Sequence, residues 1–365
     1  MLSLETSFIN SLKEKLVDLK KFESNQCNSD EFDSMFDKNK FTVNEYTVKT
    51  EDGYLNKLFR VGLTQSEKDK LTDAQKQNIN KPILLQHGLL DSADGWFVAA
   101  EKSVGFHLVN NGYDVWVGNN RGNKYSQSHS DPNISRFDFW DFCWDEMGIY
   151  DLPAFYKFIM DKTGRSKISY FGHSEGTSQM FVGGTDDHSR EFLTKHTEKF
   201  FALAPVLFMK HVESPFLQLL SRIQTPMYWS FYYTGLFNLL PSLCHEPVYL
   251  ADVLQVLCNS PFSFICKHIL PGLDFTDQSS TLDNLHISLR HYPAGSSWLN
   301  VVKYAQAFLY RDEELLRRLD RGAEGNMKHY GQTTPPTLDV RKFNIPTVLI
   351  AGTNDELGDV QDVSF

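Results

Sequence analysis

The residues with the clearest chemical potential surround Ser174, in the pentapeptide G-H-S-E-G at residues 172–176. An apolar run at residues 168–171 precedes it, and residues 177–182 after it suit a helix. A serine between a strand and a helix, with glycines two positions to either side, is typical of a nucleophile elbow, whose backbone leaves no room for side chains at the glycines. The sequence therefore predicts that Ser174 is an exposed nucleophile at the end of a sheet.

A serine nucleophile requires a base, usually a histidine oriented by a carboxylate, and donors for the oxyanion that forms on the substrate. An elbow uses the backbone amide of the next residue, here Glu175, and one amide from the loop after the third strand. In that loop Gly88 permits a tight path and Leu89 is the expected donor. The Glu175 side chain is a caution, because a carboxylate beside the oxyanion opposes catalysis unless it points away or carries a proton.

The expected order of the catalytic residues is serine, acid, histidine. Asp355 follows the apolar run at residues 346–351, so we predict that it is the acid at a strand end. Asp359 and Asp362 lie further into the same loop and are weaker candidates. The alternative for each of the three is an aspartate on the surface without a catalytic role.

All twelve histidines precede Asp355. His87 and His173 lie in the two oxyanion-hole motifs, where we expect a positioning or packing role. His291 and His329 precede the acid strand, so either one as base would break the usual order. We therefore expect the base, together with a final strand and helix, beyond residue 365. The alternative is a chain that has lost the base.

Short apolar runs alternate with helical stretches, which predicts an α/β fold with a mostly parallel sheet covered on both faces. We expect a polar loop over residues 64–81. The expected strands are 45–49, 54–61, 82–86, 113–117, 167–171, 200–204 and 346–351, and the expected helices are 97–110, 147–161 and 177–182.

The alternation stops after Pro205 and resumes near Ile345, and the intervening residues are rich in large apolar and aromatic side chains. Such a block is too long for a loop, so we predict a mainly helical cap over the site, inserted after the sixth strand. The predicted organisation is an N-terminal extension at 1–30, the first part of the core at 31–205, the cap at 206–340 and a truncated remainder of the core at 341–365.

Apolar residues recur at helical spacing over residues 3–21, which predicts an amphipathic helix. This helix either packs on its own domain or lies on a membrane or lipid droplet. The start of the chain lacks the features of a secretory signal, and no segment has the roughly 18 apolar residues of a membrane span. The default expectation is therefore a cytoplasmic protein or one peripheral to lipid surfaces.

The composition excludes several classes of protein. The net charge is -10 and no basic stripe is present, so nucleic acid is not an expected partner. The five cysteines are odd in number and form no C-x-x-C pair, which argues against a zinc site and for mostly reduced thiols. We expect no metal, no cofactor and no obligate protein partner.

These motifs, in their order and spacing, resemble the acid lipase family of α/β-hydrolases, which includes gastric and lysosomal acid lipases and fungal steryl ester hydrolases. The similarity spans about residues 45–363. It is carried by the motifs at residues 45–54, 87–92, 118–123, 172–177, 291–297 and 354–357.

The resemblance implies that Ser174 is the nucleophile, Asp355 the acid, and Leu89 and Glu175 the oxyanion donors, with the histidine after the acid. Two positions depart from the family. Glu175 replaces the usual glutamine, and the position near Tyr249 that would supply a disulfide partner is not cysteine.

The leading hypothesis is a serine ester hydrolase that cleaves lipid esters, such as acylglycerols or sterol esters, through an acyl-enzyme on Ser174. The aromatic cap favours a lipid substrate at a membrane or droplet surface. The alternatives are an inactive protein that binds lipid, and an acyltransferase that uses the same serine.

Overall fold

The structure is a computed structural model that describes residues 24, 26–235, 237–240, 291–313, 316–355 and 357–363. The helix expected over residues 3–21 and the part of the expected cap at residues 241–290 lie outside this range. Within the described residues, no helix combines the length and apolar character that a membrane span requires.

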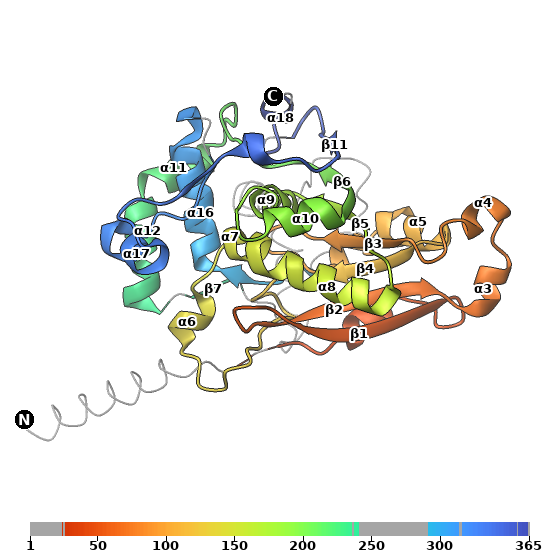
Figure 1. Ribbon diagram of the computed structural model, residues 1–365. Helices are drawn as coiled ribbons and strands as arrows, with labels where there is room; N and C mark the ends of the chain where they lie inside the picture. The colour runs from red at the N-terminus through yellow and green to blue at the C-terminus, as the bar shows by residue number, and fades with distance from the viewer. Residues whose placement is uncertain are drawn as a thin grey trace, which may run out of the picture.

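A seven-stranded sheet forms the centre of the molecule, in the order β1-β2-β4-β3-β5-β6-β11 (Figure 1). β2 is antiparallel to both β1 and β4, and the other neighbours in the sheet are parallel. All seven expected strands are present, so the mostly parallel α/β fold is confirmed. The strands are β1 Phe41–Lys49, β2 Leu55–Leu63, β3 Pro82–Gln86, β4 Asp114–Gly118, β5 Ile168–His173, β6 Thr197–Leu203 and β11 Thr347–Ile350.

Helices cover both faces of the sheet because successive side chains of its central strands point to opposite sides. Leu85 of β3 packs in one core with α5 (Val104–Asn110). Leu84 packs in a second core with α8 (Leu152–Thr163) and α9 (Glu175–Gly183). Every residue of β3 is buried, which explains why this strand is a continuous apolar run rather than an alternating one.

After β6 the chain leaves the sheet, and it returns at β11. Three helices of this insertion, α11 (Pro215–Arg222), α12 (Gln224–Thr234) and α16 (Trp298–Leu309), pack together in one apolar core with Trp144. They lie beside the carboxyl ends of the strands, to the left of the sheet in Figure 1. Two short ribbons, β7 Asn238–Leu239 with β8 Ser296–Ser297 and β9 Leu316–Arg317 with β10 Thr337–Leu338, complete the described part of the insertion.

The remaining helical segments are short, apart from α17. They are α2 Asp30–Ser34, η1 Ala93–Trp96, α6 Arg136–Trp140, α7 Trp144–Glu146, α10 Arg190–His196, η4 Arg311–Glu313, α17 Gly322–Tyr330, η5 Val340–Lys342 and α18 Val360–Val363.

Two expected segments differ in detail from the structure. The polar stretch expected as a loop contains α3 (Gln65–Asp69) and α4 (Asp73–Lys76). In α4, Thr72 forms a capping box with Gln75 that stabilises even one turn. The helix expected over 97–110 is divided: a 3₁₀ turn, η2 (Ala100–Lys102), precedes α5.

Two further details depart from the expectations. The helix expected over 147–161 begins as a π-helical turn, η3 (Met147–Asp151), which continues directly into α8. The expectation of reduced thiols is wrong for Cys27, which is disulfide-bonded. Cys143 is a free, buried thiol.

Candidate active site

Ser174 lies on the sharp turn between β5 and α9. Its φ of 50° and ψ of -115° place a non-glycine residue in a strained conformation. The turn is held on both sides: the Ser174 amide donates to the Leu203 carbonyl at 2.9 Å, and the Ser174 carbonyl accepts from the Thr177 amide at 2.8 Å. This is the geometry expected of a nucleophile elbow.

The glycines around Ser174 are required by close backbone contacts. A Cβ on Gly172 would lie 2.7 Å from the Gly176 carbonyl oxygen, and a Cβ on Gly176 would overlap the carbonyl oxygen of Gln86. Strand β5, the loop after β3 and helix α9 thus approach one another through positions that only glycine can occupy.

We expect Gly176→Ala to lower the free energy of unfolding by about 1–3 kcal/mol, because a methyl group there forces α9 away from β3. Chemical denaturation of the two proteins measures the difference. Gly62→Ala is the control, since the atom nearest to its Cβ would be the Thr42 hydroxyl oxygen at an ordinary 3.4 Å. Equal losses at the two positions would contradict this account of the elbow.

The loop after β3 passes directly beside Ser174. A Cβ on Gly88 would lie 3.2 Å from the Ser174 Cβ, so the backbone that precedes Leu89 is within reach of a substrate bound at the serine. His87 holds this loop: its Nδ1 donates to the Gly88 carbonyl at 2.8 Å, and its Nε2 accepts from the Asn120 amide at 3.1 Å. Burial lowers the pKa of His87 to about 4, so the ring stays neutral.

Asp355 lies in the turn after β11, which is parallel to β6, the neighbour of β5. Its Oδ1 accepts from the amides of Leu357 and Gly358, both at 2.9 Å. A Cβ on Gly358 would lie 3.0 Å from the other carboxylate oxygen and 3.1 Å from the carbonyl carbon of Ala204, at the end of β6. The Asp355 carboxylate and Ser174 therefore lie at the same edge of the sheet, on either side of the end of β6.

The weaker acid candidates have other partners. Asp362 binds His211 through the backbone amide and through the ring Nδ1, which lies 2.7 Å from Oδ1. Asp359 accepts from the Gln361 amide at 2.7 Å. Of the three aspartates, Asp355 has the position that the predicted acid requires.

The histidines considered from the sequence also have other partners. His291 Nδ1 lies 2.7 Å from the Asp94 carboxylate, and His329 Nε2 lies 3.1 Å from that of Asp141. Partial enclosure lowers the pKa of His173, and the carboxylate of Asp355 opposes this shift. Among the described residues, no histidine is hydrogen-bonded to Ser174.

Sequence reasoning missed Tyr304, a residue of α16 that forms a hydrogen bond with Ser174. Burial raises the pKa of Tyr304 well above its usual range, Glu175 adds to this, and a hydrogen bond with Ser174 opposes it. The phenol is therefore neutral and available to hold the serine hydroxyl. Tyr304 and Ser174 lie far apart in the sequence, so neither periodicity nor a local motif could reveal their contact.

Glu175 follows the nucleophile and is only 1% exposed. Its backbone amide, at the first position of α9, is the predicted oxyanion donor. Its side chain contacts amide groups of other elements rather than the solvent.

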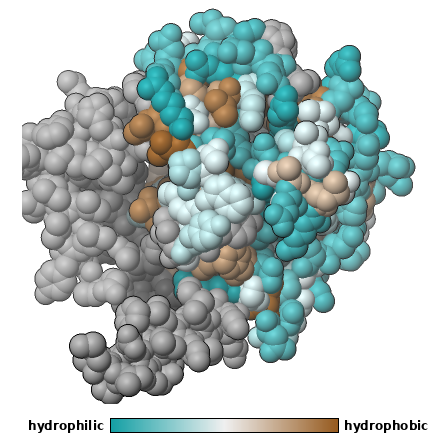
Figure 2. All heavy atoms as spheres, turned by 90° about the vertical axis from the view of Figure 1, so that its left-hand side faces the viewer, coloured by the Kyte–Doolittle hydropathy of each residue, from teal (hydrophilic) through white to brown (hydrophobic). Residues whose placement is uncertain are grey.

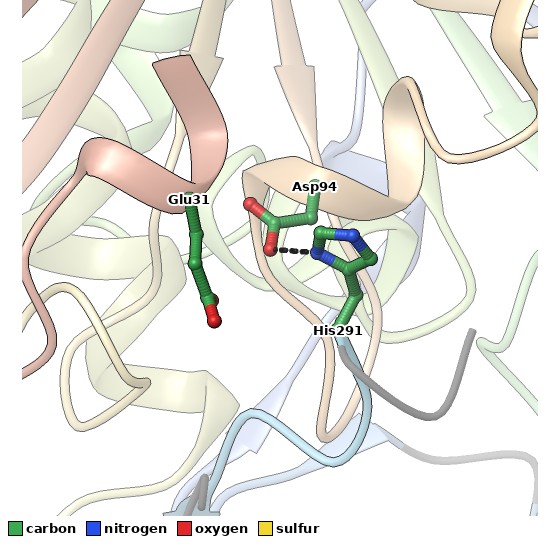
Figure 3. Close-up of side chains that lie close together, drawn as sticks. All are labelled: Glu31, Asp94 and His291. Atoms are coloured by element: carbon green, nitrogen blue, oxygen red, sulfur yellow. Dashed lines mark hydrogen bonds and ion pairs between the residues drawn. The ribbon is translucent and has the colours of Figure 1, made fainter. Parts of the chain in front are cut away.

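A cluster of Glu31, Asp94 and His291 has the spacing of a metal site, with one ligand atom of each within 4.8 Å of the others (Figure 3). The buried ammonium of Lys124 lies 2.6 Å from Asp94 and 3.1 Å from Glu31, so the carboxylates already have a cation. A divalent ion would be repelled by this ammonium. The cluster thus joins His291 to η1, the turn that follows the loop of Gly88 and Leu89, and the Lys124 ammonium occupies the place of a metal ion.

We expect neither EDTA nor excess Zn²⁺ or Ca²⁺ to change the melting temperature, because a ligand raises it only by binding the folded state. Differential scanning calorimetry with and without each reagent tests this. A rise in the melting temperature that depends on the metal concentration, and that is lost on Asp94→Asn, would show that the cluster is a metal site.

A mostly parallel sheet with a strained serine between β5 and α9 defines an α/β-hydrolase. The comparisons agree: residues 81–182 match the family model for the alpha/beta hydrolase fold, and residues 32–100 match a partial alpha/beta-hydrolase lipase region. A crystal structure of a protein from Sulfolobus solfataricus has the same fold, with a TM-score of 0.51 at 14% identity over 89% of this chain and 93% of that one.

The relatives define the family more narrowly. The gastric triacylglycerol lipase of Rattus norvegicus is 35% identical over 333 residues, which are 89% of this chain and 78% of the relative. The lysosomal acid lipase/cholesteryl ester hydrolase of Homo sapiens is 33% identical over 336 residues, with the same coverage of 89% and 78%. The chain belongs to the α/β-hydrolase family of the gastric and lysosomal acid lipases.

Proposed function

We propose that the protein is a lipase: a serine hydrolase that cleaves carboxylic esters of lipids through an acyl-enzyme. The observation that carries this proposal is the position of Ser174, strained at the sheet edge, with the Gly88 loop on one side and Asp355 beyond the end of β6. Gastric and lysosomal acid lipases among the relatives support a lipid ester as the substrate.

In the proposed mechanism, the Ser174 Oγ attacks the ester carbonyl and its proton passes to a histidine base oriented by Asp355. The backbone amides of Leu89 and Glu175 donate to the oxyanion that forms. Collapse of this intermediate breaks the bond to the alcohol, which leaves with the proton. Water then attacks the acyl-enzyme, and the fatty acid and free Ser174 are released.

The surface supports an apolar partner. Leu219 and Ile223 of the α11 region are 56% and 40% exposed, and Trp229 and Tyr233 of α12 are 45% and 80% exposed. Figure 2 shows the side of the molecule that carries these helices, where apolar residues reach the surface in patches between polar ones. We propose that this side of the cap faces the membrane or droplet that holds the substrate.

The test is release of fatty acid from emulsions of triacylglycerol and of cholesteryl ester by protein expressed from the full-length transcript. Release by the wild type and none by Ser174→Ala is the expected result. Binding of the emulsion without turnover would indicate an inactive lipid-binding protein instead. Transfer of the acyl group to an added alcohol in preference to water would indicate an acyltransferase.

A further inference from the structure

The carboxyl group of Glu175 is enclosed by amide side chains. The amide nitrogens of Asn120 and Gln179 lie 3.4 Å from its Oε1, and that of Asn300 lies 3.0 Å from its Oε2. In the part of the chain that the structure describes, no cation forms an ion pair with it. Each contact comes from a neutral amide N–H.

The network of amide side chains around Glu175 contains two acceptor oxygens without a donor. The side-chain oxygens of Gln86 and Gln179 are buried and have no hydrogen-bond partner. An ionised carboxylate adds only acceptors to such a network, whereas a protonated one adds an O–H donor. The carboxylic acid thus adds the kind of group that these two acceptors lack.

The electrostatic environment favours the same form. A buried carboxylate without a cation takes up a proton rather than remain charged. Burial raises the pKa of Glu175 to about 8, although the donors Gln179 and Asn300 oppose this rise.

The two tyrosines that interact with the charge of Glu175 do not titrate between pH 5 and pH 9. Tyr170 of β5 and Tyr304 of α16 both interact with its charge, and burial raises the pKa of each well above the usual range. Both phenols therefore stay neutral while Glu175 titrates.

The carboxylates on the elements packed against α9 have cations of their own. Asp145 of α7 lies 3.3 Å from the Lys303 ammonium of α16, and Asp151 of η3 lies 2.6 Å from the Arg121 guanidinium. These cations are thereby compensated by other carboxylates.

We infer that the folded protein holds Glu175 as a neutral carboxylic acid, a positioning residue that takes the place of an amide and keeps negative charge away from the oxyanion. The catalytic part of this inference rests on the proposed function. Loss of the proton would place an anion next to the nucleophile and oppose the oxyanion, so ester hydrolysis would fall as the pH rises.

The first test does not depend on activity. A glutamate in an unfolded chain has a pKa near 4.3, and that of folded Glu175 is about 8. The folded state therefore binds more protons between these values, and the free energy of unfolding falls as the pH rises through this window. We expect the melting temperature of the wild type to fall relative to that of Glu175→Gln between about pH 5 and pH 9.

The matched control is Glu198→Gln, whose side chain is 62% exposed beside Lys167, and its curve should run parallel to that of the wild type. A difference in melting temperature between the wild type and Glu175→Gln that stays constant over this pH range would overturn the inference. If Glu175→Gln does not fold, infrared spectroscopy of the wild type decides: a protonated-carboxyl band that persists at pH 7 and is lost near pH 8 is expected, and its absence at pH 7 would overturn the inference.

The second test is the pH dependence of kcat for ester hydrolysis. With a pKa of about 8, about one molecule in eleven keeps the proton at pH 9, so kcat of the wild type should fall about tenfold between pH 7 and pH 9. Glu175→Gln should change less than about twofold over this range. The same decrease in kcat between pH 7 and pH 9 in the wild type and in Glu175→Gln would refute the catalytic part of the inference. The expected change in relative melting temperature, without any ester hydrolysis, would instead count against the proposed function. It would still support the neutral carboxylic acid at Glu175.

Discussion

Ser174→Ala is expected to lower kcat/KM for ester hydrolysis by about three to six orders of magnitude, because it removes the hydroxyl that is proposed to form the acyl-enzyme. The backbone at residue 174 is set by the strand, the helix and the glycines around it, so alanine should keep the strained turn and the fold. Steady-state kinetics with a soluble short-chain ester measures the loss without interference from the lipid surface.

The control for this substitution is Ser34→Ala, at an exposed position at the end of α2, which should retain full activity. The melting temperature of Ser174→Ala should stay close to that of the wild type. Hydrolysis by Ser174→Ala at a rate near that of the wild type would show that another group is the nucleophile.

Arg121→Ala is expected to lower the free energy of unfolding by about 3–5 kcal/mol, more than Gly176→Ala, because it leaves a buried charge without its partner. The Arg121 side chain is 1% exposed and lies 2.6 Å from Asp151, which is fully buried, and 2.5 Å from Asp52. The guanidinium also stacks 3.9 Å from the ring centroid of Tyr54. The substitution thus removes two ion pairs and a stacking contact at once.

Urea denaturation of the variant measures this loss, with Arg341→Ala as the control. Arg341 forms a similar bidentate pair with Asp339, but its side chain is 87% exposed, so its loss should leave the free energy of unfolding nearly unchanged. Burial also raises the pKa of Asp151 to about 6, even with Arg121 opposing the shift. A loss below about 1 kcal/mol for Arg121→Ala would mean that Asp151 takes up a proton and needs no cation.

The sequence predicted those features that depend on short segments. The apolar run before Ser174 predicted β5, and the glycines at 172 and 176 predicted the turn, because both follow from local backbone geometry. Asp355 could be placed for a similar reason, since parallel strands end at the same edge of the sheet.

Contacts between distant segments could not be predicted. Asn300 reaches Glu175 from a position 125 residues later in the chain, and nothing in either neighbourhood indicates this contact. The same is true of Lys124, whose ammonium lies between two carboxylates that would otherwise suit a metal. The sequence shows that a carboxyl group follows Ser174, but the amide side chains that contact this group are known only from the fold.

Composition was also a poor guide where two side chains determine the local backbone conformation. Thr72 and Gln75 turn a polar stretch into a capped helical turn, although composition alone indicated a loop.

The most direct test of the central claim is covalent labelling by a fluorophosphonate, followed by mass spectrometry of the peptides, in protein expressed from the full-length transcript. An activated serine forms a stable bond with the phosphorus of this probe as fluoride leaves, in the same way that it attacks an ester. The account predicts a single modification on Ser174, absent from Ser174→Ala. An unlabelled protein, or a label on a different residue, would contradict it.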